Sequence, residues 1–376
     1  MYIPTLCPRP PLSGGETGRA ARACLAALAS ASGLPQQYAS PRRALGAMAG
    51  SLKQGGAMLA RVRSVGTQAP PFPDGDSWDV GASAGAWAVR YRHGATQAEK
   101  PLLYLCSPAS LQALRALLVE SGERGIVCND AETHASRWPK GVQPALPAWL
   151  AAQHNCTSFD PATGEEVRAI LRSALETLYL EQQPGYYYLA IHDEGADEDA
   201  DDDADAVAAP LSATDAAAAS LGMYRVSPPS PAPCRVRLCG AGRMLAVVAD
   251  AARLLKEDWD IATQVWSCPS YTRLARDAQA AEQWNLRHPR ATPRLAHVRR
   301  CLDDSAAPVI AVTGYGQHIA GQIGGHVRGR FIAVGADAMM EVSAPWLAVT
   351  ALKALADDGA LPLQFVEYAL RRYALL

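Results

Sequence analysis

The stretch RVRLCGAGRMLAVVADAARLLKEDWDIATQVW, residues 235–266, carries the pattern that decides the fold. Residues 235–239 predict a strand, and the Gly-Ala-Gly sequence at 240–242 predicts a tight turn. Residues 243–257 repeat apolar positions at the spacing of an amphipathic helix, and residues 261–266 predict a second strand. A strand, a helix and a strand in this order make a βαβ unit, in which the two strands lie parallel in one sheet.

The same order of elements recurs earlier in the chain. Residues 102–106 predict a strand, residues 107–120 a helix that Ser107 caps and Pro108 begins, and residues 125–128 the next strand. The other expected elements are helices at 16–31, 41–59, 163–182, 344–358 and 363–373, strands at 186–191, 309–313 and 330–334, a short helix at 317–327, and a strand or buried helix at 84–91. We therefore expect an α/β protein with two mainly parallel sheets and helices on both faces.

A proline cluster divides the chain. Residues 228–233 hold four prolines among six residues, which is typical of a linker. We predict an irregular or helical amino-terminal extension at 1–60, a first α/β domain at 61–227 and a second at 234–376.

Two segments lack a regular period and are expected to be loops. Residues 129–154 contain three prolines and two tryptophans, and we interpret them as a loop or a covering segment. Residues 192–205 are dominated by Asp, Glu and Ala, a composition typical of a solvated, mobile loop. A calcium site is the alternative for this acidic tract, but the glycine-punctuated spacing of calcium ligands is absent.

Composition excludes several classes of function. The net charge is −2 and no basic stripe is interleaved with aromatic residues, so we expect neither nucleic acid nor an anionic membrane as a partner. The nine cysteines are scattered without a CxxC pair, which indicates buried thiols in a reducing compartment and no zinc site. No apolar run reaches membrane-spanning length and the first residues are unlike a signal peptide. We expect a cytoplasmic protein.

The turn at 240–242 also resembles a dinucleotide-binding fingerprint, because a helix start offers free N–H groups to a phosphate. However, Leu245 stands where a third glycine should be, and Ser267 and Cys268 follow the next strand where an acidic ribose-binding residue should be. A plain turn between strand and helix is the favoured interpretation.

Three blocks, 155–191 (beginning NCTSFDPATGEEV), 239–255 (CGAGRMLAVVADAARLL) and 265–289 (VWSCPSYTRLARDAQAAEQWNLRHP), resemble the thiamin-diphosphate-dependent pyruvate dehydrogenase component of the homodimeric type. Residues 307–323 and 351–361 continue the resemblance. The polar end of the third block, from Tyr271 to Pro289, is either a surface helix or a recognition or subunit-contact segment.

The resemblance implies a fold and also shows departures from the family. It implies a degenerate pyrimidine-binding-like domain at 61–227 and a transketolase carboxy-terminal-like domain at 234–376. The family's further domain, which holds the magnesium and the diphosphate, has no equivalent that can be recognised in residues 1–80.

The positions that the resemblance assigns to thiamin chemistry are altered. The glutamate that would protonate the aminopyrimidine falls on Gly81 or, with a shift, on Asp79. The aromatic residues that would stack on the pyrimidine are replaced by Ala109 and Leu111. Of the histidine-rich loop, only His154 remains nearby. Asp79 and His154 are thus the candidates for a catalytic side chain, and no residue is assigned to cofactor or metal binding.

These departures favour a non-catalytic scaffold or interaction protein that is inactive alone. The alternative is one half of a split thiamin-dependent 2-oxo-acid dehydrogenase or transketolase, with thiamin diphosphate and magnesium bound only when a partner subunit supplies the missing domain. In either case we expect a homodimer, or a heterodimer with that partner. Apolar residues left without a cofactor to cover would form the interface, and the candidates are Leu111, Leu114, Leu117, Leu118, Trp346, Leu347 and Leu352–Leu355.

Overall fold

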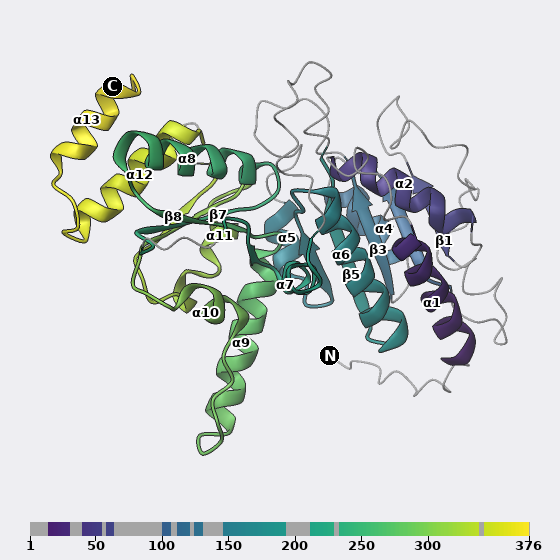
Figure 1. The fold of residues 1–376 in the computed structure, drawn as a ribbon. Helices are drawn as coiled ribbons and strands as arrows, with labels where there is room; N and C mark the ends of the chain where they lie inside the picture. Colours follow the sequence, from purple (N-terminus) through teal and green to yellow (C-terminus); the bar gives the residue numbers. More distant parts are fainter. Residues whose placement is uncertain are drawn as a thin grey trace.

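A computed structural model of the chain describes residues 14–30, 40–54, 58–63, 100–106, 111–120, 124–130, 146–192, 211–228, 233–337 and 342–375. In these residues two five-stranded sheets stand side by side, each between layers of helices (Figure 1). We refer to residues 14–192 as the first unit and to residues 211–375 as the second unit. The α/β fold with two mainly parallel sheets is confirmed.

The sheet of the first unit has the order β1-β2-β3-β5-β4, and all its strands are parallel. Its strands are β1 (Leu59–Arg63), β2 (Leu102–Cys106), β3 (Arg124–Asn129), β4 (Cys156–Phe159) and β5 (Gly185–Ala190). Strands β2, β3 and β5 at its centre are buried almost throughout, as expected when helices cover both faces of a parallel sheet.

Alternate residues of these strands face two different cores. Leu103 and Leu105 pack with helices α1 (Gly14–Ser30), α2 (Pro41–Gln54) and α6 (Gly164–Leu175). Tyr104 and Cys106 face the opposite way, toward the side covered by α4 (Leu111–Glu120) and α5 (Leu146–Ala152). The side-chain period of two therefore builds one core on each face. Helices α1 and α2, in the predicted extension, belong to the first of these cores.

The sheet of the second unit has the order β10-β9-β7-β8-β6, with only β6 antiparallel. Its strands are β6 (Tyr224–Arg225), β7 (Val236–Gly240), β8 (Thr263–Ser267), β9 (Val309–Val312) and β10 (Phe331–Val334). Helices α8 (Met244–Trp259) and α12 (Ala344–Asp357) cover one face, with α13 (Gln364–Arg372) packed against α12 and the end of α8. Helices α9 (Tyr271–Arg287), α10 (His297–Leu302) and α11 (His318–Gly321) lie on the other face. The βαβ unit predicted at 235–266 is present as β7, α8 and β8.

One hydrophobic core joins the two units. It includes Tyr188 and Ala190 of β5 together with Tyr271 and Leu274 of α9 and Ala311 of β9. The two sheets therefore share a continuous core, although each has a second core of its own.

Several elements differ from the predictions. Strands β1 and β4, helix α5, and helix α7 (Ala213–Leu221) with β6 were not predicted. The helix expected at 163–182 is α6 followed by a π-helical turn, Glu176–Leu180. The helix expected at 317–327 is α11 and a short 3-10 turn, Gly324–His326. Residues 84–91, and most of the acidic tract and of the proline linker, lie outside the described residues.

The apolar residues proposed for a dimer interface serve mainly as core. Leu114, Leu347, Leu352 and Leu355 are buried, and Leu111 and Leu118 are partly buried against the core that joins the units. The side chain of Leu117 lies outside the described part of the chain. Among the described helices, none is long and apolar enough to span a bilayer.

Candidate functional site

Buried polar groups gather where β3 and β5 end. The Asn129 side-chain amide donates to the Tyr188 hydroxyl at 3.0 Å, and the fully buried Asp130 carboxylate lies 3.3 Å from the Arg42 guanidinium. The Arg42 backbone N–H donates to the carbonyl of His192 at 3.2 Å. The carboxyl ends of parallel strands are the usual place for ligands in α/β proteins, so this cluster occupies the position where a site is expected.

His192, directly after β5, is also held by the protein. Its Nε2 lies 2.9 Å from the carbonyl oxygen of Pro161, which can only accept, so Nε2 carries the proton and donates. The imidazole therefore joins the end of β5 to the residues that precede α6. This contact fixes the ring orientation.

A buried glutamate links the two units. Thr163 caps α6 by accepting from the Glu166 N–H at 3.2 Å, and Glu166 Oε2 accepts from the Ala162 N–H at 2.7 Å. Glu166 Oε1 accepts from two hydroxyls of the second unit, Ser267 on β8 at 2.6 Å and Tyr224 on β6 at 2.8 Å. One carboxylate thus satisfies three donors from both sides of the junction.

Burial changes the acidity of this group. Desolvation raises the pKa of the Glu166 carboxyl, the hydrogen bonds from Ser267, Ala162 and Tyr224 oppose the rise, and the nearby Asp160 carboxylate adds to it. Desolvation and the adjacent Glu166 charge likewise raise the pKa of the Tyr224 hydroxyl. The Tyr224 phenol therefore stays protonated and donates to Glu166 at neutral pH.

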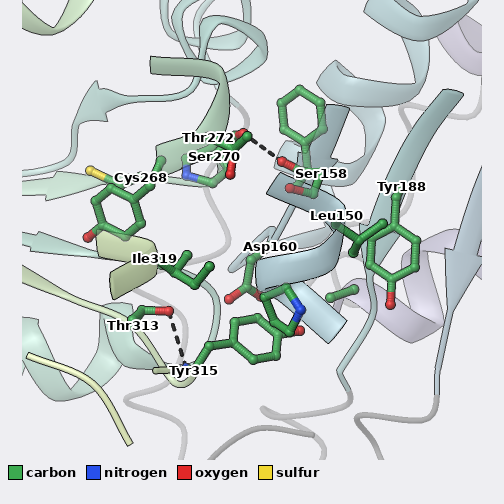
Figure 2. Close-up of a pocket in the computed structure, with 16 residues that line it drawn as sticks. Leu150, Ser158, Asp160, Tyr188, Cys268, Ser270, Thr272, Thr313, Tyr315 and Ile319 are labelled. Atoms are coloured by element: carbon green, nitrogen blue, oxygen red, sulfur yellow. Dashed lines mark hydrogen bonds between the residues drawn. The ribbon is translucent and has the colours of Figure 1, made fainter. Parts of the chain in front are cut away.

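A small pocket lies between the units, at the carboxyl ends of strands from both sheets (Figure 2). Leu150, Ser158, Asp160 and Tyr188 line it from the first unit, and residues after β8 and β9 line it from the second. The Ser270 hydroxyl donates to the Ser158 carbonyl at 2.6 Å across this junction. The cavity measures about 30 Å³, close to the volume of one water molecule and far below that of a cofactor.

The glycine turn between β7 and α8 also contacts the first unit. Gly242 adopts φ +51°, and its N–H donates to the Asp160 carbonyl at 3.0 Å. A Cβ on Gly242 would collide with the Asp160 carboxylate, so glycine permits this close approach. The donor that a phosphate would need is thus used inside the protein.

The residues that the resemblance assigned to thiamin chemistry are only partly described. Asp79, Gly81 and Ala109 lie outside the described residues. Leu111 is partly buried against the core that joins the units and offers an aliphatic side chain rather than an aromatic face. His154 is exposed in the turn before β4, at the amino end of that strand, and does not line the pocket.

At Leu111, the one described position that the resemblance assigns to stacking on the cofactor, the side chain is aliphatic. Leu111 cannot stack on a pyrimidine, and Glu166 is enclosed by its three donors. In the described ranges, no group of three or more His, Cys, Asp or Glu side chains could hold a metal ion.

Sequence reasoning did not identify the residues at the junction. The T-x-x-E sequence from Thr163 to Glu166 is a capping-box signal that could have marked the start of α6. Nothing local marks Tyr224 or Ser267, which stand 58 and 101 positions from Glu166. Only the packing of the two units reveals this cluster.

Comparison with known proteins shows which families the chain is similar to. Residues 222–337 match the family model of the transketolase-like C-terminal domain. The chain is 34% identical over 237 residues to the pyruvate dehydrogenase E1 component of Cupriavidus necator, an alignment that covers 60% of this chain and 26% of that protein. The resemblance inferred from the sequence is confirmed, and the chain spans about a quarter of the length of the curated relatives that it matches.

Solved structures show the same fold at low identity. A split-gene transketolase, described as an inactive beta4 tetramer, is 14% identical with a TM-score of 0.52, and the match covers 85% of this chain and 98% of that chain. Transketolase from Leishmania mexicana is 15% identical with a TM-score of 0.50, and the match covers 93% of this chain and 48% of that chain. These matches show a transketolase-like fold.

Proposed function

We propose that the chain is a non-catalytic subunit with a transketolase-like scaffold, which acts by binding a thiamin-dependent enzyme or a second copy of itself. The observation that carries this proposal is that the polar groups at the strand ends form hydrogen bonds within the protein. Glu166 accepts three hydrogen bonds from protein donors, and the pocket beside the junction holds only about 30 Å³.

The geometry favours a structural role for these groups. A general acid or base must reach the proton that it transfers, directly or through one water. Glu166 is fully buried and its nearest donors, at 2.6 to 2.8 Å, are its own protein's Ser267, Ala162 and Tyr224. The carboxylate is therefore available to join the units and not to a substrate.

The first test is calorimetric titration of the isolated chain with thiamin diphosphate and magnesium together. We expect no saturable heat, because Leu111 and the residues at positions 79, 81 and 109 lack the stacking ring and the glutamate that the cofactor needs. A saturable signal with a dissociation constant of about 1 to 10 µM would refute the non-catalytic role.

A second function is favoured by one comparison. The match with the split-gene transketolase spans 98% of that chain, as expected if this chain were the corresponding half of a two-subunit enzyme. Such a half would bind thiamin diphosphate only after mixing with a subunit that supplies a diphosphate-binding domain. Titration of the chain with and without such a subunit from the same genome separates the two functions.

Association is the common requirement of both functions. We expect a homodimer of the isolated chain, since two-fold dimers are the commonest closed assemblies. Sedimentation across roughly 1 to 100 µM would show a concentration-dependent shift from monomer to dimer. A chain that stays monomeric at the highest concentration contradicts self-association. The proposed function would then be binding to another subunit.

A further inference from the structure

The segment from Tyr271 to Arg300 forms a basic arm, made of α9, the returning residues 288–296 and the start of α10. It contains seven arginines and two acidic residues, a formal charge of +5, in a chain whose net charge is −2. Figure 1 shows α9 and the returning segment extending beyond the rest of the second unit.

The arm is ordered along its length. The Asn285 side chain accepts from the Arg294 N–H at 2.7 Å and donates to the Arg294 carbonyl at 3.0 Å. The Arg294 guanidinium lies 4.3 Å from the centre of the Trp284 ring, which stacks on His288 at 4.5 Å. An exposed surface that is already held in one conformation loses little entropy when a partner binds.

A groove runs between α9 and the returning segment. Its volume is about 370 Å³, and Asp277, Ala280, Ala281, Arg294, Leu295 and Arg300 line it. Its one carboxylate, Asp277, already accepts from the His297 N–H at 2.7 Å. The two alanines keep the groove open, and the two arginines make it attractive to carboxylates.

Several cations of the arm lack a carboxylate. Arg299 pairs with Glu282 at 3.5 Å, but in the part of the chain that the structure describes no ion pair involves Arg287, Arg290, Arg294 or Arg300. Such like charges repel one another until an anion binds between them.

Apolar side chains lie beside these cations. Leu286 is 82% exposed and Leu295 is 54% exposed, which indicates a contact surface when they stand next to unpaired charge.

We propose that this arm binds the acidic tract, residues 193–205, of a second copy of the chain. The tract has nine acidic residues among thirteen, and the other four are Gly or Ala, small enough to enter a groove formed by Ala280 and Ala281. Because the arm extends away from its own chain, pairing between copies lets each arm meet the other copy's tract, as two-fold symmetry requires (Figure 1). This inference rests on the proposed binding function, and it assigns the basic arm as the surface through which two copies of the chain bind.

The test uses the full chain and the double variant Arg290→Glu/Arg300→Glu. Both side chains are exposed, so the fold should tolerate the change. Sedimentation should show the dimer association constant falling by about tenfold or more, because two attractions become repulsions. The matched control, Arg172→Glu/Arg371→Glu, reverses two exposed arginines outside the arm and should stay within about twofold of the unmodified chain.

A competition experiment identifies the occupant. A synthetic peptide of residues 193–205 in excess should dissociate the dimer, and the same peptide with Asn and Gln in place of its acidic residues should not. The proposal is overturned if the arm variant dimerises as well as the control variant. It is also overturned if the acidic peptide leaves the dimer intact, or if the association of the chain does not depend on its concentration. A DNA duplex that binds the arm while the peptide does not would also overturn it, in favour of nucleic acid.

The outcomes separate this proposal from the function on which it rests. If the chain associates but neither the arm variant nor the peptide changes association, the arm proposal alone fails. If the chain binds thiamin diphosphate, the non-catalytic function alone fails.

Discussion

At the scale of single residues, Glu166 shows how a buried charge serves a junction. It accepts from one donor of its own unit and from two hydroxyls of the other, and these hydrogen bonds offset part of the desolvation that raises its pKa. At the end of β3, the buried Asp130 carboxylate is likewise paired inside the protein, with the Arg42 guanidinium. Both carboxylates stand where an α/β enzyme would keep groups for a substrate, and both are engaged internally.

Replacing Glu166 tests this role. Glu166→Ala leaves three donors without an acceptor and should lower the free energy of unfolding by about 3 kcal/mol in urea denaturation. Glu166→Gln should retain most of the stability, because the amide oxygen can accept from Ala162 while its N–H groups donate to the hydroxyls of Ser267 and Tyr224. The exposed Glu181→Ala is the control, and an equal loss there would contradict the assignment.

The buried Glu166 carboxyl should also make the free energy of unfolding depend on pH. The pKa of Glu166 is raised in the folded state above its ordinary value of 4.5, so above that pH the folded chain holds a proton that the unfolded chain has released. Stability contributed by Glu166 therefore falls as the pH rises from 4.5 toward the folded pKa. The unmodified chain should lose stability relative to Glu166→Gln over this range, and a constant difference would contradict the raised pKa.

At the scale of elements, α9 is joined to the first unit at the end of α5. The Arg276 guanidinium donates to the carbonyls of Ala151 at 3.0 Å, Gln153 at 2.7 Å and Cys156 at 2.7 Å. Ala151 lies in the last turn of α5, where helix carbonyls lack partners and the dipole favours a cation, and Gln153 and Cys156 lie between that turn and the start of β4. Arg276 thus caps one helix from another and fixes the base of the basic arm.

Removing this cap should destabilise the protein. Arg276→Ala removes the guanidinium from three carbonyls, of which that of Gln153 keeps a second donor, the Cys156 N–H at 3.1 Å. We expect a loss of about 2 to 4 kcal/mol in the free energy of unfolding. Arg276→Lys should recover only part, because a single ammonium cannot match the planar fork. Arg287→Ala, exposed on the same helix, should change stability by less than about 0.5 kcal/mol. Equal effects at positions 276 and 287 would refute the capping role.

At the scale of the whole molecule, the two units share one core. The core that joins the units runs from Tyr104 and Tyr188 in the first sheet to Ala311 in the second, and the Glu166 cluster lies on the same junction. The proline cluster at 228–233 is typical of a linker, but the packing on either side of it is continuous. Coupling between units therefore depends on side chains and not on the connecting segment.

This continuity predicts a single unfolding transition. Urea denaturation followed by tryptophan fluorescence and by far-ultraviolet circular dichroism should give coincident midpoints, because neither unit can lose the shared core alone. Two separated transitions would show that the units fold independently. Glu166→Ala should shift both probes together.

The sequence alone determined the order of strands and helices where each element carries its own apolar pattern. The βαβ unit at 235–266 is an example, because its strands are buried on both faces and its helix repeats an apolar stripe. The resemblance of the blocks at 155–191 and 265–289 likewise needed no coordinates. Strand β4, with two of its four residues partly exposed, was missed because an edge strand is stabilised by its neighbour and not by an apolar run of its own.

Only the tertiary structure decided which polar residues meet. Glu166, Tyr224 and Ser267 are far apart in the chain, and each alone fits a helix start or a strand. Arg276 likewise lies in a polar helix that the sequence left open between a surface helix and a contact segment, and its three carbonyl partners belong to the other unit. Local patterns encode burial and period, whereas hydrogen bonds across a junction depend on how two complete units pack, which no single segment specifies.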